Sequence, residues 1–437
     1  MTKSSLFGIK NIFQERLLIN LKNSNFRFLW GSSLLGHLSL AMGLIVLGWI
    51  VLDMTQDPWM VSQTIFSYGI FLFILNIFSG TITDRFPRKS LMIIGSLIRL
   101  GSWVFLAVMA STNGLNIWHI IAGSAIVGLG VGIEMPSSRV LIHDLVGNKS
   151  LMNAMSLDSI SRHASRGIGP LVGGVLYEIA GSEIALMAIC IVQIASLLSL
   201  IPIKIPVELV KNIDGGSFIK DLLGGFIYLS KNQMVLAFVL GSCITNLFLL
   251  PMIFILPVFA REILSITPSE LGILTLVGTL GSIAGATLMA TNPRINRPGL
   301  LWIGIAYFLA AVTLAFSWST IPMLSMFLLV LHGLAFATFG ALQPSIVILA
   351  STEEMRGRTS GFMSLSMCLA QVGAFVMGAF IERLGASMGL AASTAIAVVL
   401  LSLLVLVLPT FKRGSMTGAS GRNTKVKPLQ PYRRLSN

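Results

Sequence analysis

The sequence GTITDRFPRK, residues 80–89, stands at the junction of two apolar stretches, at about 59–83 and 91–110. Its charged residues are Asp84, Arg85, Arg88 and Lys89. An apolar stretch of about 20 residues is long enough to cross the hydrocarbon core of a bilayer as a helix. The charged residues are therefore predicted to mark a short loop between two membrane-spanning helices, and this pattern of span and loop decides the fold.

The composition extends this interpretation to the whole chain. Of its 437 residues, 54% are hydrophobic and 11% are charged, whereas about a quarter of a soluble protein is charged. An ordinary soluble globule is thereby excluded. The net charge of +13 would indicate nucleic-acid binding only on the clustered basic face of a soluble domain. We therefore expect no nucleic-acid partner and assign the charge to membrane orientation.

Other chemical classes are excluded by what the sequence lacks. The three cysteines stand singly in apolar runs, at Cys190, Cys243 and Cys368, without the spacing of a disulfide framework or a zinc site. No metal and no cofactor are expected. There is no phosphate-cradling Gly-Lys-Ser/Thr loop, so direct drive by ATP is not expected. There is also no nucleophile–base constellation, so the chain is not expected to be an enzyme.

Apolar runs bounded by charges or turn-forming residues predict an all-α integral membrane protein with twelve transmembrane helices. Helices are the only spanning option, because the alternating ten-residue pattern of a membrane barrel is absent. The predicted spans are about 29–52, 59–83, 91–110, 117–142, 153–180, 184–203, 234–258, 270–291, 299–318, 321–349, 358–382 and 386–409.

The distribution of lysine and arginine predicts the orientation. With the N-terminus inside, most of the 30 basic residues fall in inner segments, and only Arg261 and Arg383 fall in outer loops. Short cytoplasmic loops accumulate basic residues, so both termini are expected on the cytoplasmic side of the cell membrane. Four arginines lie within spans, and these are Arg99, Arg139, Arg162 and Arg166.

The chain is predicted to consist of two six-helix halves. The predicted segments are a cytoplasmic N-terminal segment at 1–28, the first half at 29–203, a cytoplasmic linker with an amphipathic helix at 204–233, the second half at 234–409 and a basic cytoplasmic tail at 410–437. The halves share faint similarity, because Met-Ser-Leu occurs at 155–157 and again at 363–365. Parallel repeats of this kind recur in transporters. We expect a monomer in the lipid bilayer.

Several motifs resemble those of one known family. The order Gly, three residues, Asp-Arg, two residues and two basic residues at 80–89 resembles the loop signature of the major facilitator superfamily. GIGPLVGG at 167–174 is similar to the Gly-Pro-x-x-Gly-Gly signature of its exporters. PSSRVLIHDLV at 136–146, NAMSL at 153–157 and RGRTSG at 356–361 resemble the drug and siderophore exporter branch, which holds macrolide and enterobactin exporters. The resemblance covers essentially the whole chain and is weaker in its second half.

The resemblance implies that the first loop is a conformational latch. Asp84 would rest against the start of the eleventh helix, near 357–359, and Arg88 would pair with Asp144 at the inner end of the fourth helix. The latch set is Gly80, Asp84, Arg85, Arg88, Lys89, Asp144 and Arg358. The alternative interpretation is that these charges only fix the topology.

The resemblance also implies that the exporter motif lies at the seam between the halves and marks export by antiport. Its residues are Gly169, Pro170, Gly173 and Gly174. Glycines allow a neighbouring helix to approach closely, and a proline bends the helix that contains it. Close helix packing without any directional meaning is the alternative.

Ionisable side chains within the spans are expensive and therefore indicate a site. His37, Glu134 and Arg162 are each roughly 12 Å deep at 1.5 Å per residue, and Asp158, Arg162 and Arg166 follow one helix face at intervals of four. The functional hypothesis is that Glu134 carries a proton, Arg162 or Arg166 competes for its charge, and His37 relays protons or contacts substrate. The alternative is a structural Glu–Arg pair that ties the fourth and fifth helices together.

The remaining polar residues within the spans are predicted to have lesser roles. Arg99, in a helix that is usually peripheral in the resembling family, is expected to brace the inner end. Four second-half residues could line the cavity or form packing contacts, and these are His332, Gln343, Asn246 and Gln371.

Together these observations predict a secondary active transporter with alternating access. The expected activity is export of a small amphipathic compound, such as a drug or a siderophore, against inward proton flow. The partners are then a small-molecule substrate, protons and the bilayer. Two alternatives are a lysophospholipid or other lipid translocator, and a membrane sensor that keeps this fold without transporting anything.

Overall fold

The computed structural model describes residues 19–204, 232–291, 297–351 and 356–408, and in these ranges the chain is helical without strands. The helices are η1 (Ile19–Lys22), α2 (Ser24–Thr55), α3 (Pro58–Arg85), α4 (Arg88–Ser111), α5 (Ile117–Leu200), α7 (Gln233–Phe248), η3 (Leu250–Ile255), α8 (Leu256–Glu262), α9 (Pro268–Thr291), α10 (Pro298–Ser317), α11 (Pro322–Ala350), α12 (Arg356–Leu384) and α13 (Ala386–Val407). The predicted linker helix at 217–232 and the tail at 410–437 lie almost entirely outside these ranges.

Polar side chains fix where several of these helices begin. The Asn23 side chain accepts hydrogen bonds from the first backbone N–H groups of α2. Asp57 does the same for α3, which has Pro58 in its first turn. Asn116 and Asn232 cap α5 and α7 in the same way. Each cap satisfies N–H groups that have no partner within the helix, and the residues that follow are mostly apolar.

The 84-residue helix α5 is interrupted at two glycines. Gly147 has φ 65° and Gly181 has φ 79°, a left-handed conformation that glycine adopts without steric cost. These breaks divide α5 into a first part at 117–146, a second part at 148–180 and a third part at 182–200. The parts correspond to the predicted spans at 117–142, 153–180 and 184–203.

By length and apolar composition, the described residues contain 11 candidate membrane-spanning segments. The predicted seventh span is not one continuous α-helix. It consists of α7, the 3-10 helix η3 and α8. Pro251 stands in η3, and proline has no N–H to continue an α-helical hydrogen-bond ladder, so the helix tightens there.

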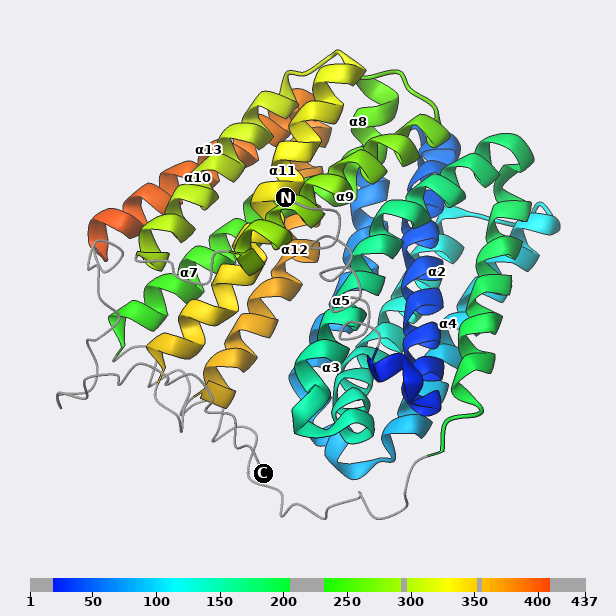
Figure 1. The fold of residues 1–437 in the computed structure, drawn as a ribbon. Coiled ribbons are helices and arrows are strands. Elements are labelled where there is room, and N and C mark those ends of the chain that lie inside the picture. Colours follow the sequence, from blue (N-terminus) through cyan, green and yellow to red (C-terminus); the bar gives the residue numbers. More distant parts are fainter. Residues whose placement is uncertain (1–18, 205–231, 292–296, 352–355, 409–437) are drawn as a thin grey trace, which may run out of the picture.

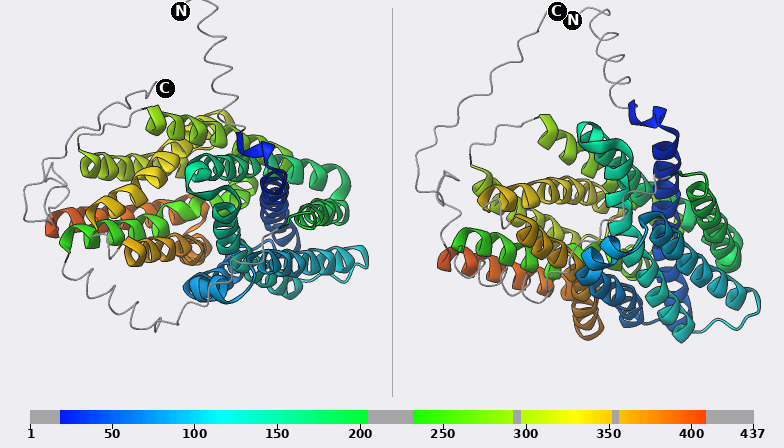
Figure 2. Two further views of the ribbon diagram at one scale, coloured as in Figure 1. Left: turned by 60° about the horizontal axis from the view of Figure 1, so that its bottom comes forward. Right: turned by 90° about the horizontal axis from the view of Figure 1, so that it is seen from below.

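The helices form two groups, one comprising α2 to α5 and the other α7 to α13 (Figure 1). The groups approach one another at the end of the molecule that carries α8 and diverge toward the opposite end. Figure 2 shows the two groups from two further directions. Contacts between them run along α5 with α9 and along α3 with α12. For example, Phe375 of α12 packs on Trp59 and Phe66 of α3, with ring centroids 4.5 and 4.7 Å apart.

Candidate functional site

Arg88 and Asp144 form the ion pair that the sequence predicts, with Nη1 and Oδ2 2.9 Å apart. Arg88 begins α4 and Asp144 lies near the end of the first part of α5. The neighbouring Lys89 donates hydrogen bonds to the carbonyls of Ile201 and Ile203, at 2.9 and 2.7 Å. Arg88 and Lys89 therefore hold the start of α4 against α5 within the first helix group.

The other predicted latch residues lie at the end of α3 and the start of α12. Gly80 belongs to α3, and the side chains of Asp84 and Arg358 lie outside the described part of the structure. Arg85 is exposed at the end of α3. The contact between Asp84 and the start of α12 therefore stays a prediction.

The replacement Asp144→Asn is expected to lower the free energy of unfolding by about 1–2 kcal/mol, between the values typical of exposed and fully buried pairs. The reason is that the Arg88 side chain is 20% and the Asp144 side chain 10% exposed, so water only partly replaces the lost partner. Thermal unfolding of the purified protein in detergent measures the change. Arg383→Gln, at an exposed position in the last turn of α12, is the control, and equal melting of both variants would count against a stabilising pair.

The glycines of the exporter motif lie where α5 touches two other helices. A Cβ atom on Gly169 would lie 2.6 Å from the Cβ of Ala41 in α2, and one on Gly173 would lie 3.1 Å from the carbonyl oxygen of Met42. Gly174 packs directly on the Pro268 carbonyl, at the start of α9 in the other helix group. The motif therefore packs partly within the first group and partly across the contact between the groups.

Glu134 lies opposite Arg99, because two glycines let their helices come together. A Cβ atom on Gly95 of α4 would lie 2.7 Å from the Gly130 carbonyl oxygen, and one on Gly130 of α5 would lie 2.6 Å from the Gly95 carbonyl oxygen. Arg99 and Glu134 each follow one of these glycines by four residues, and positions four apart share a helix face. Their ion pair is 2.7 Å long, with side chains that are 3% and 10% exposed.

This pair corrects two expectations. Glu134 is paired with Arg99 rather than with Arg162 or Arg166, and Arg99 is buried among helices rather than bracing an inner end. Arg99 also donates to the Gly36 carbonyl and, at 2.9 Å, to the Ser39 hydroxyl of α2. One guanidinium therefore joins α4 to α2 and to the first part of α5.

The other charged residues predicted for the site gather around the second part of α5. Asp158 forms an ion pair with Arg162 one turn along the same helix. The guanidinium of Arg166 lies 5.8 Å from the ring centroid of Phe336 in α11, within the range of a cation–π contact. Arg166 therefore faces the second helix group.

His37 of α2 lies in the electrostatic field of four arginines, which are Arg162, Arg99, Arg166 and Arg139. Its Nδ1 atom is buried without a hydrogen-bond partner among the described residues. His37, Arg162 and Arg166 therefore lie within electrostatic reach of one another, and their common role in a proton or substrate site stays a prediction. Arg139 also acts on His37. Its only signal in the sequence is its position within a predicted span, which was not enough to assign it to the site.

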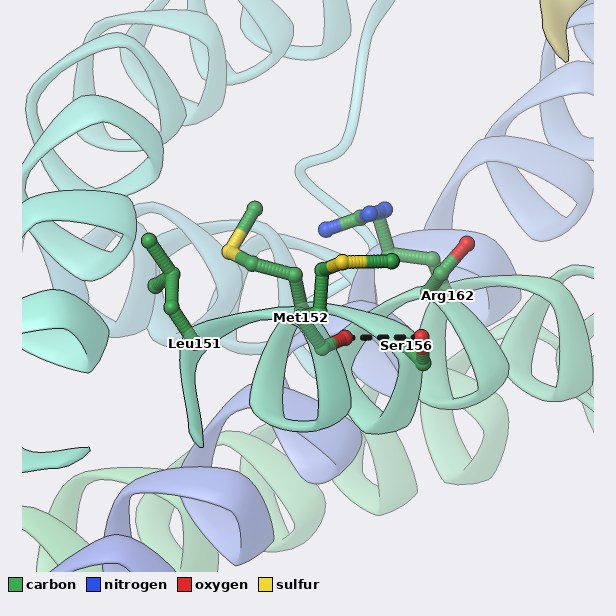
Figure 3. A pocket seen from close by; sticks show the side chains of 6 residues that line it. Leu151, Met152, Ser156 and Arg162 are labelled. Carbon is green, nitrogen blue, oxygen red and sulfur yellow. Dashed lines mark hydrogen bonds between the residues drawn. The ribbon is translucent and has the colours of Figure 1, made fainter. Parts of the chain in front are cut away.

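A pocket of about 560 Å³ extends along this part of α5. Figure 3 shows Leu151, Met152, Ser156 and Arg162 on its wall, with the Ser156 hydroxyl bonded to the Met152 carbonyl. Met155 and Ser159 complete the lining, and Met152 is 87% exposed. The wall is therefore apolar at one end and carries the Arg162 guanidinium at the other.

A second group of polar contacts joins the two helix groups at the end that carries α8. The Asp53 carboxylate, in the last turn of α2, pairs with Arg261 of α8 at 2.7 Å and accepts a hydrogen bond from Tyr177. The Glu178 carboxylate accepts hydrogen bonds from the Ser269 hydroxyl and, at 3.0 Å, from the Ser269 backbone N–H in the first turn of α9. These contacts have no signal in the sequence, because a hydropathy pattern does not indicate which helix ends, far apart in the chain, lie side by side.

The four second-half candidates divide into two kinds. Gln343 donates to Met363 and Ser366 of α12, and Asn246 donates to the Ser242 carbonyl in its own helix. These two residues make packing contacts. His332 Nε2 and Gln371 Oε1 are buried without a hydrogen-bond partner in the described part of the chain.

The sequence model of the transmembrane secretion effector family, within the major facilitator superfamily, matches residues 17–428. The chain belongs to this family of membrane transporters. It is similar to macrolide efflux protein A of Streptococcus pyogenes, with 22% identity over 70% of this chain and 76% of the relative. It is also similar to the enterobactin exporter EntS of Citrobacter koseri, with 24% identity over 81% and 84% of the two chains. The protein is therefore a multi-pass membrane transporter of the drug and siderophore exporter branch and not an enzyme.

Solved structures of transporters share the fold of this family member. A peptide transporter POT matches with a TM-score of 0.74 and 13% identity, covering 89% of this chain and 95% of that one. A bacterial homologue of the lysosomal transporter Spinster, in an inward-facing and unoccupied conformation, matches with a TM-score of 0.67 and 15% identity, covering 89% and 96%. At this identity the likeness establishes the fold alone.

Proposed function

We propose that the protein is a secondary active transporter that exports a small amphipathic compound in exchange for protons, by alternating access. Membership of an efflux family supports the export of such a compound. The observation that carries the proposal is the central set of charged side chains between two helix groups, because charges inside a membrane protein are retained at substrate and ion pathways.

The proposed fold has twelve spans in two six-helix halves. The candidate segment Ser150–Leu200 has 51 residues, which at 1.5 Å per residue would be about 76 Å long, against about 30 Å of hydrocarbon. The break at Gly181 supports counting it as two spans. With basic residues on the inside, both termini are cytoplasmic and the end that carries α8 faces outward.

In this orientation the structure corresponds to a state open to the cytoplasm. The Asp53–Arg261 and Glu178–Ser269 contacts support this assignment, because they join the halves at the outer end. The latch of Gly80, Asp84, Arg85, Arg88, Lys89, Asp144 and Arg358 would then hold the opposite, outward-open state. Arg88 and Asp144 are already paired within the first half, so this pair does not have to form when the latch closes.

Proton coupling is proposed to involve Glu134 with Arg99, rather than Arg162, as the cation that competes for its charge. The competing interpretation is that the pair is structural. It has support in the geometry, because Arg99 also binds α2, so separating it from Glu134 requires rearrangement inside one half.

A transport assay across a panel of amphipathic compounds tests the proposed function. Inverted vesicles from a host that lacks its own exporters are expected to accumulate at least one compound, and a proton uncoupler is expected to abolish the accumulation. Transport of lysophospholipids alone would indicate a lipid translocator. No transport by a correctly folded protein would indicate a sensor, and transport unaffected by the uncoupler would contradict proton coupling.

A further inference from the structure

The arginines between the helix groups outnumber the described carboxylates that pair with them. Arg99 is paired with Glu134, and Arg162 is paired with Asp158. The remaining two arginines within the spans are Arg139 and Arg166. Neither forms an ion pair with a carboxylate among the described residues. Within the described part of the chain, the central cluster therefore has two arginines that no carboxylate pairs.

These two arginines belong to one region. Arg139, on the first part of α5, is within electrostatic reach of Arg162, Asp158 and, across the contact between the groups, Cys368 of α12. Arg166 is within reach of Arg162 and lies over the Phe336 ring of α11. Both side chains are exposed rather than packed inside a helix group. They therefore present guanidinium groups to the space between the two helix groups.

Uncharged polar atoms accompany this positive charge. His37 Nδ1 is buried without a partner in the described chain, although four arginines act on its ring. His332, which is 2% exposed, likewise has an unpartnered Nε2. It lies one helical turn before Phe336 and so shares its face of α11. Unpaired buried polar groups are costly and indicate where a ligand or water completes the hydrogen bonds.

The geometry points to a binding site for an amphipathic organic anion, with a carboxylate, phosphate or similar oxyanion head on Arg139 and Arg166. Guanidinium groups bind such oxyanions through paired, charge-assisted hydrogen bonds. The apolar body of the ligand would lie along the pocket wall formed by Leu151, Met152 and Met155, with Arg162 at its charged end. This assignment rests on the proposed transport function and specifies its substrate class.

The cluster disfavours cations as substrates. A cationic compound would have to approach two exposed guanidinium groups that form no ion pair among the described residues, and like charges repel. The Glu134 and Asp158 carboxylates are already engaged with Arg99 and Arg162. The arginines therefore select the charge of the substrate. The flexible side chains of Met152 and Met155 on the pocket wall adapt to the size and shape of its apolar body.

Fluorescent probes of opposite charge test the site in two assays. Carboxyfluorescein represents a soluble organic anion, a fluorescent lysophosphatidylglycerol represents an anionic lipid, and ethidium represents an organic cation. Binding to the purified full-length protein is measured by fluorescence anisotropy, and transport is measured in inverted vesicles. The variants are Arg139→Gln and Arg166→Gln, with Arg383→Gln as the matched control at an exposed position.

We expect an anionic probe to bind, and each central variant to weaken its apparent affinity about tenfold or more, the loss typical of a charge-assisted hydrogen bond. The control is expected to bind as the wild type does. Arg139→Lys and Arg166→Lys keep the positive charge and are expected to retain part of the affinity. These variants test the site even if the glutamine variants fail to fold. If the replacements weaken the binding of carboxyfluorescein, the ligand is a soluble organic anion. If they weaken the binding of the lysophosphatidylglycerol, the ligand is an anionic lipid.

Two outcomes separate this assignment from the proposed function. Transport of ethidium, with no arginine-dependent binding of either anion, would overturn the anion site and leave the transport function standing. Arginine-dependent binding of an anion, without transport of any compound across the panel, would support the site and overturn the transport function. Equal anion binding by the wild type and both glutamine variants would also overturn the site.

Discussion

Replacement of Arg99 by methionine is expected to lower the free energy of unfolding by about 3–5 kcal/mol, the range measured when one partner of a buried ion pair is removed. The replacement leaves the Glu134 carboxylate, which is only 10% exposed, without its counter-charge. It also removes the donors to the Gly36 carbonyl and the Ser39 hydroxyl. Thermal unfolding in detergent, with the fraction of monodisperse protein as a second readout, measures the loss.

The double replacement Arg99→Met with Glu134→Leu separates the charge from the packing. Because both charges disappear together, the double variant is expected to recover most of the stability lost in the single variant. A double variant as unstable as Arg99→Met would contradict this account and would attribute the loss to packing alone. The close contact of Gly95 and Gly130 is unchanged in every variant, so the helices themselves remain able to approach.

The same variants decide the role of Glu134 in transport. If Glu134 carries the coupled proton, a folded double variant, or Glu134→Gln, is expected to bind substrate but to lose its dependence on the proton gradient. If the pair is structural, the folded double variant is expected to keep proton-dependent transport. Asp158→Asn, which removes the other central carboxylate, is the matched comparison for the proton dependence.

Gly174→Val is expected to disfavour the conformation described here by about 1–3 kcal/mol, the usual cost of overpacking. A side chain at Gly174 would collide with the Pro268 carbonyl, where the second part of α5 meets the start of α9. The two helix groups would be pushed apart at the end that carries α8. Such a cost corresponds to a shift of about five- to 150-fold in the equilibrium between conformations, and transport is expected to fall accordingly.

Spin labels at Ile179 and Met323, which are highly exposed and belong to different helix groups, report the separation. Pulsed electron paramagnetic resonance is expected to show a longer distance population in Gly174→Val. Gly304→Val is the matched control, because a Cβ atom on Gly304 meets nothing within 4 Å. An unchanged distance distribution together with normal transport would show that this contact does not limit the approach of the two helix groups.

Helix existence and order were predictable from the sequence because the bilayer leaves the backbone few alternatives. Every peptide group in hydrocarbon must be hydrogen-bonded within the protein, so an apolar run of sufficient length is a helix. The detail that failed was continuity in the seventh span, where Pro251 converts part of the segment to η3. The two glycine breaks in α5 lie between predicted spans, where the sequence already showed an interruption of the apolar runs.

Part of the site was predictable for a similar reason. The shared helix face of Asp158 and Arg162 followed from helical periodicity alone. Their ion pair was not predicted, because Arg162 was expected to compete for the charge of Glu134. The pair of Arg88 and Asp144 followed from the resemblance of the first loop to a known signature. Both predictions depended on local spacing or on a motif, and neither required knowledge of how the helices are rotated.

The sequence by itself determined the membrane class, the order of the spans and the presence of charges at mid-depth. Only the tertiary structure decided which charges meet. Glu134, Arg162 and His37 have similar estimated depths, but depth along a helix says nothing about rotation around its axis. That rotation is set by close packing, here at Gly95 and Gly130, which places Glu134 against Arg99 and leaves Arg139 and Arg166 without a carboxylate partner among the described residues.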